Sequence, residues 1–306
     1  MRIAFTKTLF EIIKKDKKVI LLTADLGYSV FEELERKYPK QFVNAGIAEQ
    51  NMTGIAAGMA MEGLKPVIYS IVPFVTMRNF EQIRNDICYQ NLNVKIVGVG
   101  AGFSYGPYGH THHGLEDISI LRALPNLEIY SPGDPAETVE VTKLALNHIG
   151  PSYIRLGRAG EPTVHEAKIS ITKGKAIQLS EGSDLGIFST STMLFSSNLV
   201  RKMLHKKGLR VSLYSMPTIK PFDSKTVLKV ASKTKLLVSI EEHFAVGGLG
   251  TAISECLADV GTPVKLLRIG VPDSFTKVIG SQEYMRKANG LDPEAIVKRI
   301  LKNLNR

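Results

Sequence analysis

One carboxylate stands out as a candidate for proton chemistry. Glu49 follows Gly46-Ile47-Ala48 and begins a predicted helix of mostly small and apolar residues that continues through Ala60. The free N–H groups and the dipole of a helix stabilise a carboxylate in its first turn, and for most glutamates this explanation suffices. However, burial disfavours the charged form of a carboxyl group, so a buried acid can hold or share a proton near neutral pH. Glu49 could therefore exchange a hydrogen bond with a nitrogen of a bound ring.

A second candidate for chemistry is the long loop of residues 100–114, which is rich in glycine, tyrosine and histidine. Its glycines would let the backbone approach a ligand closely. Three histidines, His110, His112 and His113, raise the question of a metal ion. In an extended loop His110 and His112 would face the same way, but no carboxylate or cysteine completes a set at a known metal spacing. We therefore expect no metal site in this chain.

The elements around these residues alternate between strand and helix. Buried strands are predicted at residues 19–23, 65–72 and 94–99, and helices at residues 5–14 and 30–38. This alternation is typical of parallel sheets, whose ligands gather at the carboxyl ends of the strands. The sequence therefore predicts that residues just after each strand lie close together.

Three residues lie shortly after the ends of these strands and are therefore candidates for ligand binding. Asp25, in the turn Ala24-Asp25-Leu26-Gly27, could cap a turn or contact a ligand. Phe74 lies at a strand-to-helix junction, where an aromatic residue is more often part of the core. Arg78 could be a surface residue or an anchor beside a pocket. The residue types alone leave these alternatives open.

Length and composition suit a globular enzyme of two domains. The 306 residues are 44% hydrophobic and 22% charged. The first residues predict an amphipathic helix rather than a signal peptide, and no apolar run is long enough for a membrane span. Cys88 and Cys256 lie far apart, so a reduced, cytoplasmic compartment is the simplest expectation. We expect no association with a membrane.

The net charge of +10 raises the question of nucleic acid binding. Basic residues are scattered, with short runs only at Lys14-Lys15, Lys17-Lys18 and His205-Lys206-Lys207. No aromatic residues are interleaved with them, as a stacking platform would require. We therefore expect no nucleic acid partner, and assign the charge to solvated helix faces, a few arginines that bind phosphate, or an acidic partner chain.

The stretch Gly46-Ile47-Ala48-Glu49-Gln50-Asn51 resembles the glutamate motif of the pyrimidine-binding domain of thiamine diphosphate enzymes. It is most similar to the transketolase and deoxyxylulose-phosphate synthase branch. The resemblance covers essentially the whole chain, and the order and spacing of several motifs together support it. The other motifs include Ala24-Asp25-Leu26-Gly27, Gln82-Ile83-Arg84-Asn85, Thr111-His112-His113, Leu124-Pro125-Asn126, Arg155-Leu156-Gly157-Arg158 and Glu241-Glu242-His243-Phe244-Ala245-Val246-Gly247-Gly248.

The resemblance implies an α/β fold with two three-layer αβα domains. The first would be a pyrimidine-binding domain with a parallel sheet, and the second a domain like the transketolase C-terminal domain, which serves mainly in assembly. We expect the first domain at residues 1–160, a linker at 161–175 and the second domain at 176–306.

The resemblance also implies residues that bind thiamine diphosphate. Glu49 would be catalytic: it would bond N1′ of the aminopyrimidine, favour the imino tautomer and help to deprotonate thiazolium C2. Phe74 would pack against the aminopyrimidine, and Arg78 would lie beside it. Asp25 and Leu26 would contact the cofactor from the turn after the first strand.

Four residues are implied in contact with substrate. His112 would be a hydrogen-bond partner of the substrate and a second catalytic residue, with His113 beside it. Arg158 matches an arginine that binds a sugar phosphate, and a guanidinium fork suits phosphate geometry. Transketolases carry Gly-Glu-Asp-Gly before the Thr-His pair, and that Asp reads a sugar hydroxyl. This chain has Gly106-Pro107-Tyr108-Gly109, so Tyr108 replaces the Asp and substrate choice would differ.

One motif of the family is missing from this sequence. Transketolases bind the diphosphate and a divalent ion through Gly-Asp-Gly followed further along by Asn, and no such stretch occurs here. The chain therefore resembles the carboxyl half of a split transketolase. A separate amino-terminal chain would bind the diphosphate and Mg²⁺ (or Ca²⁺), with the site between the chains. We expect a dimer or a heterotetramer.

The preferred function is that of a subunit that helps to transfer a two-carbon ketol unit between sugars, either phosphorylated or nucleotide-linked. One alternative is the β-chain of a 2-oxo-acid dehydrogenase, against which the histidine loop and Arg158 argue, or a decarboxylating enzyme like deoxyxylulose-phosphate synthase. Another alternative is a non-catalytic assembly or regulatory module, since a fold alone does not prove a function.

Overall fold

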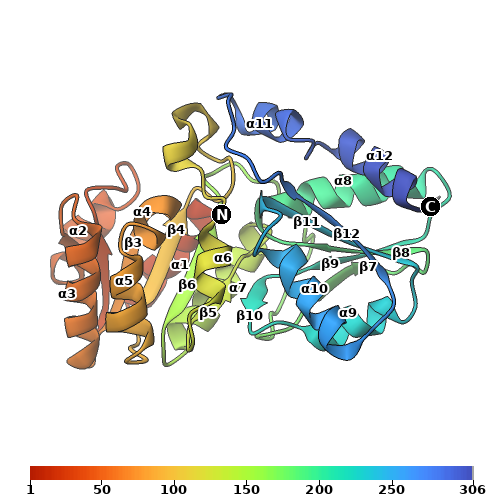
Figure 1. The fold of residues 1–306 in the computed structure, drawn as a ribbon. Coiled ribbons are helices and arrows are strands. Elements are labelled where there is room, and N and C mark those ends of the chain that lie inside the picture. The colour runs from red at the N-terminus through yellow and green to blue at the C-terminus, as the bar shows by residue number, and fades with distance from the viewer. Residues whose placement is uncertain (305–306) are drawn as a thin grey trace.

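The chain forms two α/β units, each built on one sheet (Figure 1). The computed structural model describes residues 1–304. The first sheet has the strand order β10-β5-β6-β4-β3-β1-β2, in which β1 to β6 run parallel and β10 antiparallel to β5. Its strands are β1 (Val19–Thr23), β2 (Phe42–Asn44), β3 (Lys65–Ile71), β4 (Lys95–Val99), β5 (Glu128–Tyr130), β6 (Ser152–Leu156) and β10 (Thr218–Lys220).

Helices cover both faces of this sheet because its strand residues alternate between two apolar layers. In β1, Val19 and Leu21 pack into one cluster, and Ile20 and Leu22 into the other. The first layer is covered by α1 (Arg2–Ile13), α2 (Glu32–Lys37) and α7 (Pro135–Asn147). The opposite layer is covered by α3 (Glu49–Met61), α4 (Val72–Thr76), the π-helix η2 (Ile83–Cys88) and α6 (Asp117–Arg122).

The second sheet has the strand order β12-β11-β8-β9-β7, parallel except for β7. Its strands are β7 (Ile177–Ser180), β8 (Leu185–Ser189), β9 (Val211–Ser215), β11 (Leu236–Phe244) and β12 (Lys265–Val271). Its helices are α8 (Leu194–His205), α9 (Ser224–Ala231), α10 (Leu249–Val260), α11 (Gln282–Ala288) and α12 (Pro293–Leu304). Two α/β units with helix-covered sheets confirm the predicted fold class.

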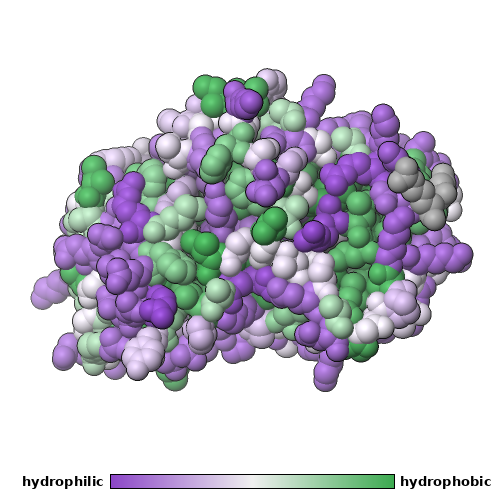
Figure 2. Space-filling view, in the orientation of Figure 1, coloured by the Kyte–Doolittle hydropathy of each residue, from purple (hydrophilic) through white to green (hydrophobic). Residues whose placement is uncertain are grey.

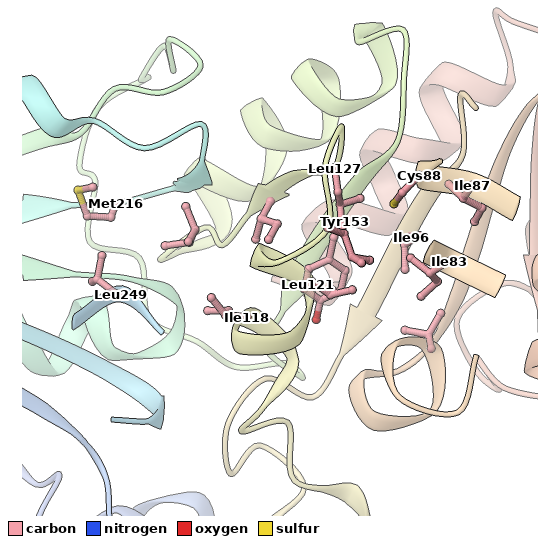
Figure 3. Close-up of a cluster of buried hydrophobic side chains, with 14 of the residues drawn as sticks. Ile83, Ile87, Cys88, Ile96, Ile118, Leu121, Leu127, Tyr153, Met216 and Leu249 are labelled. Atoms are coloured by element: carbon pink, nitrogen blue, oxygen red, sulfur yellow. The ribbon is translucent and has the colours of Figure 1, made fainter. Parts of the chain in front are cut away.

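The two units share one apolar core. A single buried cluster runs from Ile96 and Tyr153 of the first sheet, through Ile118 of α6, to Met216 and Leu249 of the second unit (Figure 3). β10 also crosses the predicted boundary, because it belongs to the second part of the sequence but pairs with β5. The limits at residues 160 and 176 stay a prediction.

The segment after β3 is not a single helix. The structure has α4, a break at residues 77–79, α5 (Phe80–Gln82) and then η2. At the break, buried Asn79 donates a hydrogen bond from Nδ2 to Thr53 Oγ1 of α3 at 2.7 Å. This cross-link accompanies the interruption and leaves Arg78 outside regular helix, next to the start of α3.

The surface shows no long apolar band on the face drawn in Figure 2, where hydrophilic residues are spread between small apolar groups. None of the helices within residues 1–304 combines the length and apolar character needed to cross a bilayer. Cys88 and Cys256 are both free and buried.

Candidate active site

The carboxyl ends of five parallel strands bring most of the candidate residues to one edge of the first sheet. In an open α/β sheet this edge is where ligands bind, because the loops and helix N-termini meet there. In the spatial order β6-β4-β3-β1-β2, the candidates that follow each strand are Arg158, then Tyr108 and His112, then Phe74 and Arg78, then Asp25, and finally Glu49.

Glu49 is the first residue of α3 and is 1% exposed. Its carboxylate oxygen Oε2 accepts a hydrogen bond from Arg78 Nη1 at 2.8 Å. Within residues 1–304, Arg78 is the residue that donates a hydrogen bond to the Glu49 carboxylate. Because a buried carboxylate without a partner is costly, the arginine is an important part of the local electrostatics.

Phe74 connects this ion pair to the histidine loop. The guanidinium carbon of Arg78 lies 4.3 Å from the centre of the Phe74 ring. The ring of His112 meets Phe74 edge-on, with 5.1 Å between ring centres and 70° between planes. Glu49, Arg78, Phe74 and His112 therefore form one continuous line of contacts, although they come from three different segments of the chain.

The loop of residues 100–114 is compact rather than extended. It contains two 3-10 helices, η3 (Gly106–Tyr108) and η4 (His110–His112), at the top of the first unit in Figure 1. The expectation that His110 and His112 face the same way is therefore wrong. His112 packs against Phe74, whereas the His110 ring lies 4.3 Å from that of Phe275 in the second unit. A 3-10 turn separates these side chains because the backbone rotates between them.

Tyr108 and Arg158 extend the same line of contacts. The Tyr108 ring, 59% exposed, lies 5.2 Å from the His112 ring at an angle of 30°. The Arg158 guanidinium carbon lies 5.4 Å from the centre of the Tyr105 ring, which in turn lies 6.5 Å from His112. Tyr105 is a contact that sequence reasoning missed; its place directly before Gly106 in the glycine-rich loop was the available signal.

His112 is arranged to be neutral at pH 7. Burial, and then the nearby Arg78 cation, hold the pKa of His112 below its ordinary value of 6.5. Thr111 Oγ1 lies 3.0 Å from His112 Nδ1 and can fix the tautomer of the ring. A neutral imidazole offers one donor and one acceptor, which suits a hydroxyl or carbonyl group of a substrate.

The structure does not bring His113 to the same surface. This residue is 1% exposed, and its ring packs edge-on against Phe103 with 5.1 Å between centres. His113 Nε2 lies 3.3 Å from the Gly106 carbonyl oxygen, which accepts the hydrogen bond. His113 therefore lies behind the loop and stabilises η3 from inside, while its neighbour His112 points toward Phe74.

Asp25 lies beside the line of contacts rather than in it. Its backbone, with φ of 52°, turns sharply after β1, and its N–H donates to Asn44 Oδ1 at 3.0 Å. The same oxygen accepts from Gly46 N–H at 3.0 Å. Asn44 thus ties the end of β1 to the approach to Glu49, and sequence reasoning missed it. Leu26 is half-buried and packs against the cluster that contains α1.

The described residues offer no obvious place for a metal ion. No group of three or more His, Cys, Asp and Glu side chains in residues 1–304 is arranged to bind one. The side chains that line the candidate site are one carboxylate, one neutral imidazole, two guanidinium groups and several aromatic rings.

Comparison with known proteins gives matches along nearly the whole chain. A family described as transketolase, pyrimidine binding domain, matches residues 1–161, and one described as transketolase, C-terminal domain, matches residues 174–296. An apulose-4-phosphate transketolase subunit of Phocaeicola vulgatus is 37% identical over 302 residues, which cover 98% of this chain and 96% of that protein.

Two further matches bear on the choice between functions. 1-Deoxy-D-xylulose-5-phosphate synthase of Caldanaerobacter subterraneus is also 37% identical over 97% of this chain, but the match covers only 48% of that protein. A solved structure described as a split gene transketolase, inactive beta4 tetramer, superposes with a TM-score of 0.91 at 35% identity, covering 99% of this chain and 98% of that one.

Proposed function

The chain belongs to the transketolase family as the carboxyl-half subunit of a split transketolase, a transferase, and we propose that the contacts from Glu49 to Arg158 form its share of a thiamine diphosphate site. Most of the residues expected to bind cofactor or substrate lie along that line. The remaining chemistry would come from a second chain, which binds the diphosphate and Mg²⁺ (or Ca²⁺).

The environment of Glu49 supports this proposal. The planar, cationic guanidinium of Arg78 fits against the Phe74 ring at 4.3 Å and donates to the buried Glu49 carboxylate at 2.8 Å. A planar heteroaromatic ring that carries an N–H group needs the same two contacts. The residues present therefore fit an aminopyrimidine ring between Phe74 and Glu49.

Each side chain then has a definite task. When bound, thiamine diphosphate supplies the electron sink for cleavage of a carbon–carbon bond. Glu49 accepts a hydrogen bond from the pyrimidine and holds or moves its proton. Neutral His112 orients a hydroxyl or carbonyl group of the sugar, and exposed Arg158 binds its phosphate or nucleotide diphosphate.

The surface around the site supports a partner chain. Several large apolar side chains next to the site residues are exposed. They border the polar and charged groups of the site. Partner interfaces often combine exposed apolar contacts with polar residues. The exposed side chains are Tyr28 (71%), Ile47 (76%), Met77 (37%) and Tyr108 (59%). We propose that the diphosphate-binding subunit covers this rim, and that two such pairs assemble further.

A decarboxylating reaction like that of deoxyxylulose-phosphate synthase is the second candidate, because the identity to that relative is equally high. The two activities are distinguished by substrate. A ketol transferase consumes a ketose and an aldose, whereas the alternative releases carbon dioxide from a 2-oxo acid. A full-length match to a transketolase subunit favours the first.

The test uses the complex reconstituted from this chain and the diphosphate-binding chain. We expect Glu49→Gln to lower kcat of ketol transfer by at least about a hundredfold, within the range for loss of proton transfer at a positioned group. Calorimetry should show that this variant complex still binds thiamine diphosphate with magnesium, because the diphosphate contacts remain. Arg36→Ala, which changes an exposed residue of α2, is the matched control and should turn over normally.

Unchanged turnover of the Glu49→Gln complex would exclude the assigned role of Glu49. If the wild-type complex bound no thiamine diphosphate, a non-catalytic assembly module would be the better description. Release of carbon dioxide from pyruvate, with no ketol transfer from any sugar phosphate tested, would favour the decarboxylating alternative.

A further inference from the structure

Arg78 makes both contacts that the proposed cofactor ring needs. Its Nη1 donates to Glu49 Oε2 at 2.8 Å, and its guanidinium group lies over Phe74 with 4.3 Å from the carbon to the ring centre. A guanidinium is planar, cationic and rich in N–H donors, so it resembles a protonated heteroaromatic ring in shape and polarity. Glu49 is 1% exposed, whereas the Arg78 side chain is 44% exposed.

We infer that Arg78 is a stand-in for the aminopyrimidine: in the isolated chain it holds the place between Glu49 and Phe74, and it swings out when the cofactor ring enters. This inference rests on the proposed function, since it takes the ring to bind between Glu49 and Phe74. It adds a competition between a residue of this chain and the cofactor, and thereby links cofactor affinity to the conformation of one side chain.

The need for a stand-in follows from the burial of Glu49. A buried carboxylate that loses its donor carries a large desolvation cost, so the isolated chain is more stable with Arg78 in place. When the ring donates its own N–H group, the carboxylate stays satisfied without the arginine. The exchange therefore replaces one donor by another and leaves no buried charge alone.

The backbone around Arg78 permits this movement. Arg78 follows the end of α4 and precedes α5, in the break at residues 77–79, so its backbone lies outside regular helix. Its backbone N–H donates a long hydrogen bond, 3.4 Å, to the Pro73 carbonyl oxygen. Because almost half of the side chain is already exposed, rotation into solvent breaks few contacts besides those to Glu49 and Phe74.

The inference predicts the sign of the effect of removing Arg78. If the cofactor must first displace Arg78, its apparent affinity is the intrinsic affinity multiplied by the fraction of molecules in which Arg78 has already left Glu49 and Phe74. In the reconstituted complex, calorimetry should therefore show that Arg78→Ala binds thiamine diphosphate about tenfold more tightly than wild type. Arg78→Lys keeps a cation for Glu49, but an ammonium group is not planar and cannot stack on Phe74. The affinity of this variant for thiamine diphosphate should therefore lie between those of wild type and Arg78→Ala. Arg36→Ala should match wild type.

A second readout is thermal stability, measured first on the isolated chain without cofactor and then on the complex with cofactor. The isolated chain with Arg78→Ala should melt at a lower temperature than wild type, because Glu49 then lacks its donor, and thiamine diphosphate should restore more stability to the variant complex than to the wild-type complex. If Arg78→Ala prevents folding, Arg78→Lys still tests the order of affinities.

The outcomes separate this inference from the proposed function. If wild-type complex binds thiamine diphosphate and Arg78→Ala binds it equally or more weakly, Arg78 stays in place as a clamp and the stand-in role is wrong, while the proposed function holds. If the wild-type complex does not bind the cofactor at all, the proposed function fails and the stand-in role fails with it.

Discussion

Two adjacent residues of the same type, His112 and His113, have opposite environments. His112 faces Phe74 at the surface of the site, and His113 is buried against Phe103. The resemblance pointed to both as substrate contacts. Sequence could not separate them, because the direction of each side chain depends on the 3-10 turn η4, which forms from contacts of the whole loop.

Tyr108 is predicted to influence the choice of sugar acceptor. Its ring lies nearly alongside that of His112, so a substrate bound at His112 would also meet Tyr108. We expect Tyr108→Asp to change the ratio of kcat/KM between two sugar acceptors by at least about tenfold, or about 1.4 kcal/mol, because a carboxylate reads a hydroxyl that a phenol ring instead covers. Competition assays with paired aldose phosphates measure this ratio.

Tyr108→Phe is the control, since it keeps the ring and removes the hydroxyl. If the ring sets the preference, Tyr108→Phe will retain the wild-type ratio while Tyr108→Asp changes it. An unchanged ratio in Tyr108→Asp would remove the support for a role of this residue in substrate choice.

At the scale of elements, α3 combines a functional end with an unusual outer face. Its first residue is Glu49, and its outward residues include two glycines with nothing near them. A glycine within a helix costs about 1 kcal/mol relative to alanine. The exposed positions are Gln50, Asn51, Gly54, Gly58 and Met61. α3 lies at the end of the first unit away from the second sheet, so this face is open to a partner (Figure 1).

Gly58→Ala should therefore have effects of opposite sign on stability and assembly. An added Cβ meets no atom within 4 Å, so the isolated chain should gain about 1 kcal/mol in free energy of unfolding. If the partner's backbone approaches this face, the same methyl group should weaken association of the two chains. Urea denaturation and analytical ultracentrifugation measure the two effects separately.

Lys202→Ala, at an exposed position of α8 in the second unit, is the matched control and should alter neither quantity much. Full-strength association of the Gly58→Ala chain would show that the outer face of α3 is not closely covered.

At the scale of the whole molecule, buried polar groups fix the two units to each other. Arg155 of β6 donates to Asp117 Oδ2 at 2.8 Å and to the Glu242 carbonyl oxygen of β11 at 3.0 Å. His243 Nδ1 donates to the Phe244 carbonyl oxygen at 2.7 Å, and its Nε2 accepts from Ser119 of α6 at 3.4 Å. Both nitrogens of His243 are thus used by a neutral ring.

His243 makes stability depend on pH. Burial lowers its pKa from 6.5 to about 4, although nearby Asp117 acts in the opposite direction. In the folded chain the ring stays neutral down to pH 4, whereas in the unfolded chain it gains a proton below pH 6.5. The free energy of unfolding should therefore fall by roughly 3 kcal/mol from this residue as pH drops from 6.5 to 4.

His243→Asn keeps a donor for the Phe244 carbonyl but cannot be protonated. We expect the variant to be less stable than wild type at about pH 7, with a difference that shrinks as pH falls toward about 4. Urea titrations of both chains at several pH values give this difference. A constant difference across that range would mean that His243 is not the source of the pH dependence.

Local and periodic features of this protein could be predicted from its sequence. Short apolar runs that alternate with helical segments predicted buried parallel strands. The helix at Glu49 with the motifs around it indicated the transketolase family and a split subunit, which the comparisons confirm. These signals are accessible because strand and helix periods, turns and motifs depend on residues a few positions apart. The roles of the individual site residues stay proposals.

Which side chains meet became known only from the tertiary structure. It paired Glu49 with Arg78, joined Tyr105 to Arg158, placed β10 in the first sheet and set His243 against Ser119. The physical reason is that such contacts depend on strand order and on how two apolar layers pack together. Many orders are compatible with the same local pattern, and the shared core that selects one of them forms from residues far apart in the chain.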